Sequence, residues 1–268
     1  MDLSIIVLNY KQKGLVKYCL KNLLSLSLPI LYEIIVVDNA SADGLATMLK
    51  NEFMSVKLVQ AEANRGYAAG NNLGIKAAQG KYILVLNPDV YLSQHAILGL
   101  IDFMEKNPQA GMVGPKVLNP DNTLQYTCLN FPDWHLPFFR RTILGKTKAG
   151  QDWLRHYQMQ DENLDQPIKA PWLYGACLMI SQSALNKVGL LDERYFLYLE
   201  DLDWCRRFWE NNFEVWYNPL VSAIHFHQRL SAESGFLNVI FSRPARIHLT
   251  SWLKYYWKFH NRPLPKID

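Results

Sequence analysis

The chain contains 268 residues, of which 49% are hydrophobic and 19% are charged, and its formal net charge is +4. This length suits one large α/β domain or one domain with an appendage. The charged fraction is too high for an integral membrane protein, and no uncharged apolar window of about 18 residues is present that could span a bilayer.

The start of the chain and the cysteines predict a cytoplasmic protein. Residues 1–4 lead directly into a strand pattern, without the basic start and apolar core of a signal peptide. The cysteines lie in apolar surroundings, and their spacing is typical of neither disulfides nor metal sites. They are Cys19, Cys128, Cys177 and Cys205. We therefore expect reduced thiols in a reducing compartment.

The first hundred residues alternate between strand and helix patterns. Short apolar runs that are typical of strands are separated by segments with apolar residues at helical spacing. The strand patterns cover residues 4–8, 33–37, 56–59 and 81–86, and the helix patterns cover 14–28 and 69–78. Strands that are apolar on both faces and separated by helices predict a parallel sheet covered on both sides.

Polar residues follow each predicted strand. They are Asn9-Tyr10, Asp38-Asn39, Asn64-Arg65 and Asn87-Pro88-Asp89. Ligands of such sheets bind outside the carboxyl ends of the strands, so these residues are candidates for a binding site. Ordinary turn residues are the alternative explanation for part of this pattern.

The second half is less regular. Residues 119–122 predict a hairpin turn, and residues 172–180 and 181–188 predict a strand followed by a helix. Residues 130–170 show no clear periodicity, which is typical of a substrate loop or lid.

Three carboxylates, Glu200, Asp201 and Asp203, lie inside the aromatic run of residues 195–208. Such apolar surroundings predict partial burial, and a buried carboxylate requires a partner, a metal or a chemical role. Asp201 has a structural alternative as the N-cap of a helix that begins at Leu202. We assign Asp203 to structure, as the partner of Arg207 at i+4.

Asp89 is presented at the edge of the sheet because Pro88 ends the strand. One hard carboxylate beside a diphosphate is a common minimal site for Mg²⁺ or Mn²⁺. Taken alone, Asp89 would be read as a turn residue. Its combination with residues 200–203 predicts a metal-assisted site with a separate base.

Five motifs in this order resemble those of family 2 glycosyltransferases, and most closely the bacterial rhamnosyltransferase-like members. The motifs lie at residues 4–10, 36–43, 64–74, 86–89 and 175–201. The resemblance covers roughly residues 3 to 230. It implies an α/β nucleotide-diphosphate-sugar-binding fold of the GT-A type, with a mainly parallel central sheet flanked by helices. It also implies a divalent cofactor, Mg²⁺ or Mn²⁺, and inversion at the anomeric carbon.

The resemblance also implies roles for individual residues. Asp201 matches the catalytic base, with Glu200 beside it, and Asp89 and His225 match metal ligands. Asn87 stands where the family's Asp-x-Asp motif has its first Asp, so Asp89 is the ligand we expect. The residues expected to contact the nucleotide and donor are Leu8, Asn9, Tyr10, Asp38, Asn39, Asp43, Arg65, Asn71, Asn72, Asn87, Pro88 and Arg229. His227 and Arg229 are candidates to face the diphosphate.

These implications predict a transferase domain at residues 1–230, with a nucleotide-sugar-binding half (1–118) and an acceptor and catalytic half (119–230). The expected activity is transfer of L-rhamnose from dTDP-L-rhamnose to a lipid-linked or polysaccharide acceptor in bacterial cell-surface glycan synthesis. One alternative is another donor, such as UDP-GlcNAc, UDP-galactose or a GDP-sugar. Another is a catalytically silent protein that binds a nucleotide sugar or glycan. A nucleic-acid partner is not expected, and the oligomeric state stays open.

Residues 231–268 predict a basic, aromatic helical tail. From Arg243 to Lys266 the chain contains no acidic residue, and five aromatic residues lie among the basic ones. They are Trp252, Tyr255, Tyr256, Trp257 and Phe259. Such a tail suits an anionic partner or the inner membrane face, which the protein would contact peripherally through residues 243–268. The alternative is an amphipathic helix packed on the domain, with its basic face in water.

Overall fold

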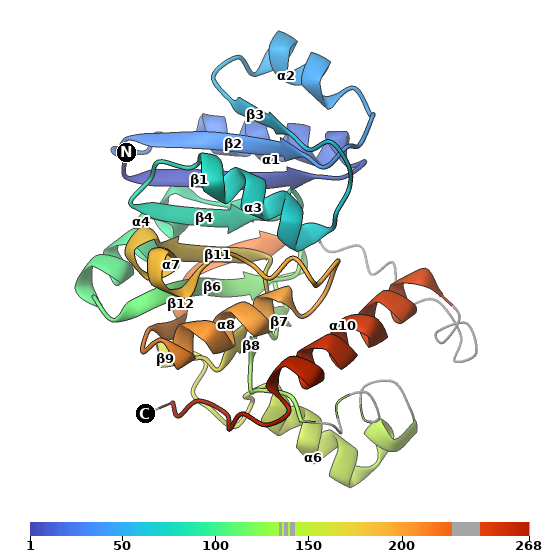
Figure 1. Cartoon of the computed structure of the whole chain (residues 1–268). Coiled ribbons are helices and arrows are strands. Elements are labelled where there is room, and N and C mark those ends of the chain that lie inside the picture. The colour runs from blue at the N-terminus through green and yellow to red at the C-terminus, as the bar shows by residue number, and fades with distance from the viewer. Residues whose placement is uncertain (134–135, 137–138, 140–142, 227–241, 268) are drawn as a thin grey trace.

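The computed structural model describes residues 1–133, 136, 139, 143–226 and 242–267 (Figure 1). Its main sheet has ten strands, in the order β3-β2-β1-β4-β11-β6-β12-β5, with β7 beside β6 and β9 beside β12. The elements of the first half are β1 (Leu3–Asn9), α1 (Lys13–Ser25), β2 (Tyr32–Asp38), α2 (Leu45–Glu52), β3 (Lys57–Gln60), α3 (Tyr67–Ala77), β4 (Tyr82–Leu86), β5 (Val90–Leu92), α4 (Gln94–Lys106) and β6 (Ala110–Leu118). They are followed by β7 (Leu124–Gln125), β8 (Cys128–Leu129), η1 (Ile143–Lys146), α6 (Lys148–Tyr157), β9 (Ile168–Lys169), β10 (Trp172–Leu173), β11 (Cys177–Ser181), α7 (Gln182–Val188), α8 (Glu200–Glu210), β12 (Glu214–His225) and α10 (Arg243–Phe259).

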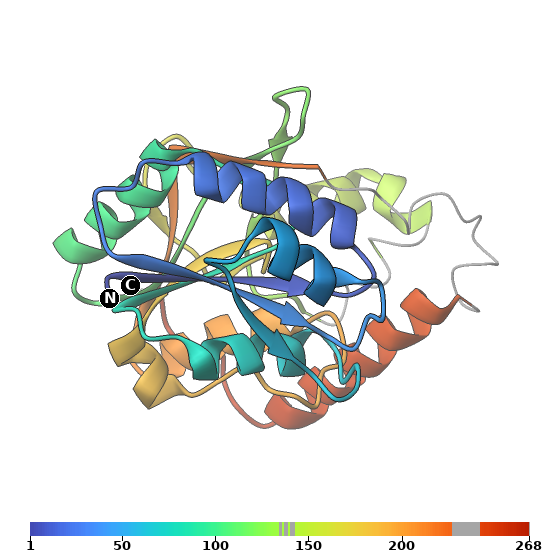
Figure 2. The same ribbon diagram turned by 90° about the horizontal axis from the view of Figure 1, so that it is seen from above.

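The α/β fold expected from the sequence is confirmed. Strands β3, β2, β1 and β4 are parallel neighbours, and a helix joins each of them to the next along the chain, as the alternating patterns predict. Helices α1, α2 and α4 pack on one face of the sheet, and α3, α7 and α8 pack on the other (Figure 2). All five residues of β4 are buried, as a strand covered on both faces requires.

Strand β11 runs against this direction in the middle of the sheet. It lies antiparallel between β4 and β6. This insertion brings the chain before β11 to the carboxyl end of β4, where the backbone N–H of Asn87 donates to the carbonyl oxygen of Ala176 (2.9 Å). Residues 87–89 and residues 175–176 therefore meet at one edge of the sheet.

The long strand β12 delivers His225 to the same edge. It pairs in parallel with β6 and antiparallel with β5, where His225 lies opposite Val90. Beyond the strand, the backbone N–H of Phe226 donates to the carbonyl oxygen of Asp89 (2.8 Å). The backbone thus fixes residues 89 and 225 side by side, although 136 positions separate them in sequence.

The segment 130–170 is more regular than we predicted. Its described part contains the helix α6, which begins after Thr147, a side chain that accepts from the N–H of Gly150. The alternating polar and aromatic residues of this segment hid the helix, because its apolar face is short. The hairpin turn at residues 119–122 is confirmed by the antiparallel pair of β6 and β7.

Helix α8 begins two residues earlier than the sequence indicated. Its N-cap is Leu199, in a left-handed conformation (φ 67°), and the helix contains Glu200 and Asp201 in its first turn. The alternative assignment of Asp201 as the N-cap is therefore wrong. The predicted pair of Asp203 and Arg207 is confirmed, with Nε of Arg207 2.6 Å from Oδ1 of Asp203.

Helix α10 packs beside α8 (Figure 1) and is joined to it by polar contacts. Nζ of Lys258 bonds the buried carboxylate of Asp203 and also that of Asp192. The guanidinium of Arg206, on α8, lies 4.0 Å from the ring centroid of Phe259 and donates to carbonyl oxygens at the end of the chain. Among the described residues, no helix is both long and apolar enough to cross a membrane.

Candidate active site

Polar side chains form a hydrogen-bonded cluster at the carboxyl ends of β1 and β2. Nδ2 of Asn9 lies 3.4 Å from Oδ1 of Asp38, 3.0 Å from Oγ of Ser41 and 3.1 Å from Oδ2 of Asp43. Asn9 and Asp38 are also direct neighbours in the β1–β2 register. Three of the residues expected to bind the nucleotide are therefore in contact with one another. Tyr10 follows them and is 42% exposed, so its ring is available to a ligand.

Asn39, which follows β2, is hydrogen-bonded to the loop before α3. Nδ2 of Asn39 donates to Oδ1 of Asn64 and to the carbonyl oxygen of Gly66, both at 3.0 Å. Gly66 has φ 101°, and a Cβ at this position would lie 2.2 Å from the carbonyl oxygen of Phe196. Only glycine fits there, because the backbone of residue 196 passes directly over it. That carbonyl also accepts from the N–H of Tyr67 (2.7 Å).

Four further residues were expected to contact the sugar donor, and they differ in how far they are already bonded within the protein. Arg65 lies 3.5 Å from Glu193 with its side chain 73% exposed, which leaves it accessible. Nδ2 of Asn71 donates to the carbonyl oxygen of Tyr67 (3.1 Å). The buried amide of Asn72 donates to the carbonyl of residue 191 and accepts from its N–H, so it joins α3 to that loop. Leu8 lies under Gly70, where a Cβ would meet its side chain at 2.6 Å.

Asp89 and His225 face each other at the other end of the site. Nε2 of His225 lies 3.3 Å from Oδ1 of Asp89, and the two side chains are only 9% and 19% exposed. Behind the ring, Nδ1 of His225 lies 3.0 Å from Oε1 of Gln125. Pro88, which precedes Asp89, ends strand β4 as the sequence predicts.

The bonds of Gln125 fix the tautomer of His225. Its Nε2 donates to Oδ1 of Asn119 (2.7 Å) and to the carbonyl oxygen of His225 (3.1 Å), so its Oε1 must be the group that accepts from Nδ1. In the neutral imidazole, Nε2 then turns a lone pair toward the carboxylate of Asp89. The two atoms are close enough to bind the same divalent cation, and a hydrogen-bonded second nitrogen is the usual arrangement of a metal-binding histidine.

Within the described part of the chain, no third His, Cys, Asp or Glu joins this pair in a group that could hold a metal. A cation there would take its remaining ligands from substrate oxygens and water. His227 and Arg229 lie outside the described residues.

The two acids at the start of α8 have unusual environments. Oδ2 of Asp201 accepts from the N–H of Gly175, and Oδ1 accepts from that of Leu202, both at 2.8 Å. Burial raises the pKa of Asp201 to about 6, although these backbone bonds act in the opposite direction. Burial and the neighbouring charge of Asp201 raise the pKa of Glu200 well above its ordinary value. Oε2 of Glu200 is buried and has no hydrogen-bond partner among the described residues.

Tyr67 connects the two ends of the site. Its hydroxyl lies 3.0 Å from Oδ1 of Asn87 and 2.8 Å from the carbonyl oxygen of Gly175, whose own N–H binds Asp201. Burial raises the pKa of Tyr67, and the charges of Glu200, Asp201 and Asp89 raise it further. The charges of acids at both ends of the site therefore act on the hydroxyl of Tyr67. We did not predict Tyr67 from the sequence; its position inside the 64–74 motif was the available signal.

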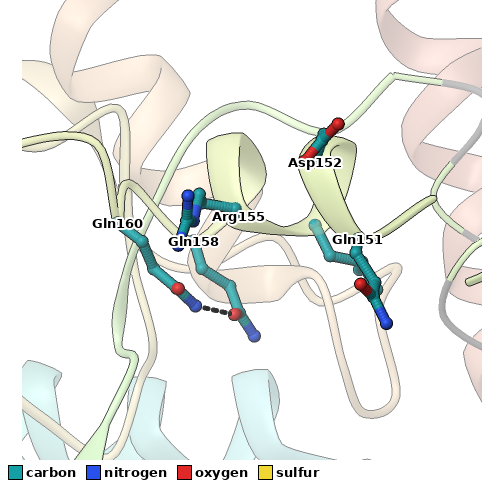
Figure 3. A pocket seen from close by; sticks show the side chains of 6 residues that line it. Gln151, Asp152, Arg155, Gln158 and Gln160 are labelled. Atoms are coloured by element: carbon teal, nitrogen blue, oxygen red, sulfur yellow. Dashed lines mark hydrogen bonds between the residues drawn. The ribbon is translucent and has the colours of Figure 1, made fainter. Parts of the chain in front are cut away.

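A separate polar pocket of about 330 Å³ lies on α6 (Figure 3). Gln158 and Gln160 are hydrogen-bonded to each other at its rim. Its lining is Gln151, Asp152, Leu154, Arg155, Gln158 and Gln160. None of the residues predicted for the site lines this pocket.

Curated relatives of this chain are sugar transferases. The N-acetylglucosaminyl-diphospho-decaprenol L-rhamnosyltransferase of Mycobacterium tuberculosis is 29% identical over 204 residues, which cover 72% of this chain and 66% of the relative. The rhamnosyltransferase WbbL of Escherichia coli is 25% identical, over 84% of this chain and 81% of the relative. The low-salt glycan biosynthesis hexosyltransferase Agl10 of Haloferax volcanii is 27% identical, with 84% and 67% covered. The chain thus spans about two thirds of the first of these relatives.

Solved structures share the fold. GalNAc-T7, solved with UDP, GalNAc and Mn²⁺, superposes with a TM-score of 0.70 at 14% identity, over 98% of this chain and 48% of the other. The mannosyltransferase PcManGT of Pyrobaculum calidifontis, solved with GDP-Man and Mn²⁺, gives 0.64 at 16% identity, over 98% and 65%. The family model described as glycosyl transferase family 2 matches residues 4–189, and the chain belongs to this family.

Proposed function

We propose that this protein is an inverting glycosyltransferase that uses a nucleotide-diphosphate sugar, a divalent cation and Asp201 as the base. One observation carries the proposal. The hydroxyl oxygen of Tyr67 lies 3.0 Å from Oδ1 of Asn87, two residues before the expected metal ligand, and 2.8 Å from the carbonyl oxygen of Gly175, so its one proton serves two acceptors, and the N–H of Gly175 donates to Asp201. A cation-binding end and a proton-accepting end of one site are what such a transfer requires.

The donor is proposed to lie along the carboxyl edge of the sheet. The polar cluster of Asn9, Asp38 and Asp43 suits the base and ribose of a nucleotide, because it offers amide and carboxylate groups that are already held in place. The exposed guanidinium of Arg65 suits a phosphate. Bound between Asp89 and His225, Mg²⁺ or Mn²⁺ supplies positive charge to the departing diphosphate. The Mn²⁺ in the solved relatives supports this assignment.

Asp201 is proposed to take the proton of the acceptor hydroxyl. With a pKa of about 6, its carboxylate is mostly ionised at pH 7 and still basic enough to accept a proton. Each of its oxygens accepts one backbone N–H, which leaves a lone pair for the hydroxyl. Burial and the charge of Asp201 raise the pKa of Glu200, which favours its protonated form and so reduces the negative charge beside Asp201.

We propose L-rhamnose from dTDP-L-rhamnose as the donor and a lipid-linked glycan as the acceptor. The names of two relatives support rhamnose, and one of these names includes a diphospho-decaprenol acceptor. UDP-GlcNAc, UDP-galactose and GDP-sugars are the competing donors. A silent binding protein is the competing class of function.

We further propose a cytoplasmic protein that contacts the inner membrane face through its tail. Leu249, Leu253 and Trp257 follow one another at i+4 on α10 and are 56%, 57% and 80% exposed. Arg246 and Lys254 flank this apolar stripe on the exposed side of the helix. Apolar residues beside basic ones suit an anionic bilayer surface. Residues 1–230 would then form the transferase domain, and residues 231–268 the membrane-contacting tail.

The experiment is a panel of nucleotide sugars, assayed for release of nucleoside diphosphate with Mg²⁺ or Mn²⁺ and with EDTA. We expect metal-dependent release that is highest with dTDP-L-rhamnose. Another preferred donor would replace the rhamnose assignment while keeping the reaction. A protein that binds donors but releases no diphosphate from any of them, with a polyprenyl-diphosphate-linked sugar present as acceptor, would be a binding protein instead.

A further inference from the structure

A second cavity, of about 330 Å³, lies between α10 and the loop of residues 192–199. Three of its lining residues are basic, and among the described residues that line it none is acidic. The lining consists of Phe196, Arg243, Arg246, Ile247, Thr250, Ser251 and Lys254. The hydroxyls of Thr250 and Ser251 already donate to the carbonyl oxygens of Arg246 and Leu197, so the three basic side chains are the groups that would bind an anion. Three clustered cations favour an anion, and the guanidinium fork is suited to phosphate.

The positive charge of this cavity is not neutralised within the described protein. Arg243, Arg246 and Lys254 form no ion pair with a described carboxylate, and Nζ of Lys254 donates only to the carbonyl oxygen of Arg194 (2.6 Å). Lys258, one turn further along α10, differs, because Asp192 and Asp203 both bind it. The basic residues that hold α10 to the domain are thus paired, whereas those in the cavity remain available to an external anion.

The cavity is joined to the proposed base by a short length of chain. Phe196, in its wall, accepts a hydrogen bond through its carbonyl oxygen from the N–H of Tyr67, and Tyr67 reaches Gly175. Asp201 follows Phe196 by five residues, a length of chain that spans at most about 17 Å. A ligand whose anionic group lies in the cavity can therefore extend a sugar toward Asp201. The apolar stripe of Leu249, Leu253 and Trp257 runs beside the cavity along the same helix, and Trp257 lies three residues beyond Lys254.

We propose that this cavity binds the diphosphate of the lipid-linked acceptor. The proposal rests on the proposed function, to which it adds an acceptor subsite. The diphosphate would contact Arg243, Arg246 and Lys254, the lipid chain would follow the exposed apolar stripe, and the terminal sugar would face Asp201. No bond forms or breaks in the cavity, which acts by charge and position alone.

The test measures binding of a short-chain alkyl diphosphate by calorimetry, in EDTA and without donor. EDTA removes any cation held by Asp89 and His225, so that site cannot bind the probe through metal. We expect the R243Q/R246Q variant to bind roughly tenfold more weakly or worse, because hydrogen bonds to charged groups are lost. The matched control is K21Q/K50Q, which removes two exposed lysines from α1 and α2 and should bind like the parent protein. Equal binding by R243Q/R246Q and the parent protein would overturn the proposal.

A second experiment distinguishes two possible ligands of the cavity, the acceptor diphosphate and the phospholipid of the bilayer. The same variants are sedimented with vesicles of phosphatidylglycerol or phosphatidylcholine. Loss of binding to the alkyl diphosphate supports the acceptor even where vesicle binding also falls, because Arg246 flanks the apolar stripe that is proposed to contact the bilayer. Loss of vesicle binding with unchanged alkyl diphosphate binding assigns the cavity to phospholipid and overturns it. Neither readout requires sugar transfer, so failure of the donor panel would leave this result interpretable on its own.

Discussion

The hydroxyl oxygen of Tyr67 lies 2.8 Å from the carbonyl oxygen of Gly175, and the N–H of the same glycine lies 2.8 Å from Oδ2 of Asp201. Tyr67 therefore fixes the residue that fixes the proposed base. A Cβ on Gly175 would lie 3.4 Å from Asp201 and 3.7 Å from the Tyr67 hydroxyl, so the three groups are already in close contact. The positions of the base and of Asn87 are coupled through one phenol.

Replacement of Tyr67 by Phe tests this coupling. We expect kcat to fall about tenfold with little change in the KM for the donor, because the base is displaced while the nucleotide pocket stays intact. The N–H of Gly175 lowers the pKa of Asp201, so a looser bond should move the acid limb of the pH–rate profile to higher pH. Tyr18→Phe, at a residue that is 73% exposed on α1, is the control. An acid limb that does not move would show that the hydroxyl has only a structural role.

Replacement of Asp201 by Asn tests the base directly. We expect kcat to fall by about 10²- to 10⁴-fold while donor binding is retained, because the amide cannot accept the proton. In the parent protein, kcat should fall as the pH drops through about 6, where Asp201 becomes protonated. Asp203→Asn is a poor control, since it breaks a buried ion pair, so Asp152→Asn, at an exposed residue of α6, serves as the control for the change in charge. Retained transfer by Asp201→Asn would remove Asp201 from the mechanism.

Asp201→Asn should also change the pH dependence of stability, because it removes a buried carboxylate whose charge opposes folding at neutral pH. The folded pKa of Asp201, about 6, lies above the ordinary carboxylate value, so folding favours the protonated form. This contribution is fully present below about pH 4 and is lost as the pH rises through about 6. The amide of Asp201→Asn leaves one of the two backbone N–H groups without its acceptor at every pH, so the change between two pH values is the informative quantity. The melting temperature of Asp201→Asn relative to that of the parent protein should be higher at pH 7 than at pH 4, because only the parent protein has a buried charge at pH 7 that it lacks at pH 4. A relative melting temperature that does not change between pH 4 and pH 7 would contradict the burial argument.

Replacement of Gln125 by Leu tests the metal pair without touching either ligand. Loss of the acceptor at Nδ1 frees the ring of His225 to take the other tautomer. Loss of such a second contact commonly weakens metal binding by about 10- to 100-fold. Binding of Mn²⁺, followed by electron paramagnetic resonance with nucleoside diphosphate present, measures the effect. Gln151→Leu, on α6, is the control, and equal Mn²⁺ affinity in both variants would count against His225 as a ligand.

The sequence predicted the contacts at the ends of β1 and β2 better than the contacts around Gly175 and Asp201. Polar residues at the carboxyl ends of parallel strands meet by the geometry of the sheet, so the strand patterns alone suffice to place Asn9 and Asp38 together. The antiparallel insertion of β11 follows no local pattern, because strand order depends on packing between distant segments. That insertion brings Gly175 to Asn87, so the contacts of Tyr67 with these two residues could not be predicted from the sequence.

The start of α8 was misplaced for a related reason. The aromatic run before it has no capping residue, and the structure uses Leu199 in a left-handed conformation at the N-cap. Contacts from Phe196 to Gly66 and Tyr67 hold this loop, and they join residues that are about half the chain apart. The partner of His225 was equally hidden, because Gln125 lies 100 residues away.

Membrane contact through α10 is tested by the double variant L253S/W257S. Both side chains are more than half exposed, so the substitutions remove apolar surface without opening the core. We expect the affinity for phosphatidylglycerol vesicles to fall roughly tenfold or more, with unchanged donor hydrolysis in solution. The matched control is Y18S/L31S, which removes an exposed tyrosine and leucine from the opposite end of the chain. Equal vesicle binding by both double variants would exclude the stripe as the contact surface.

Replacement of Lys258 by Met tests whether α10 stabilises the helix that carries the base. Nζ of Lys258 bonds the side chain of Asp203, which is fully buried on α8 three residues after Glu200. Removal of one partner leaves a buried charge with less compensation, at a cost of roughly 3 kcal/mol. Thermal unfolding should shift down by about 5–10 °C in a chain of this size. Lys266→Met, at an exposed residue near the end of the chain, should shift by no more than about 1 °C. If both variants melt together, the contact between α10 and α8 contributes little, and the tail is an appendage rather than a support for the base.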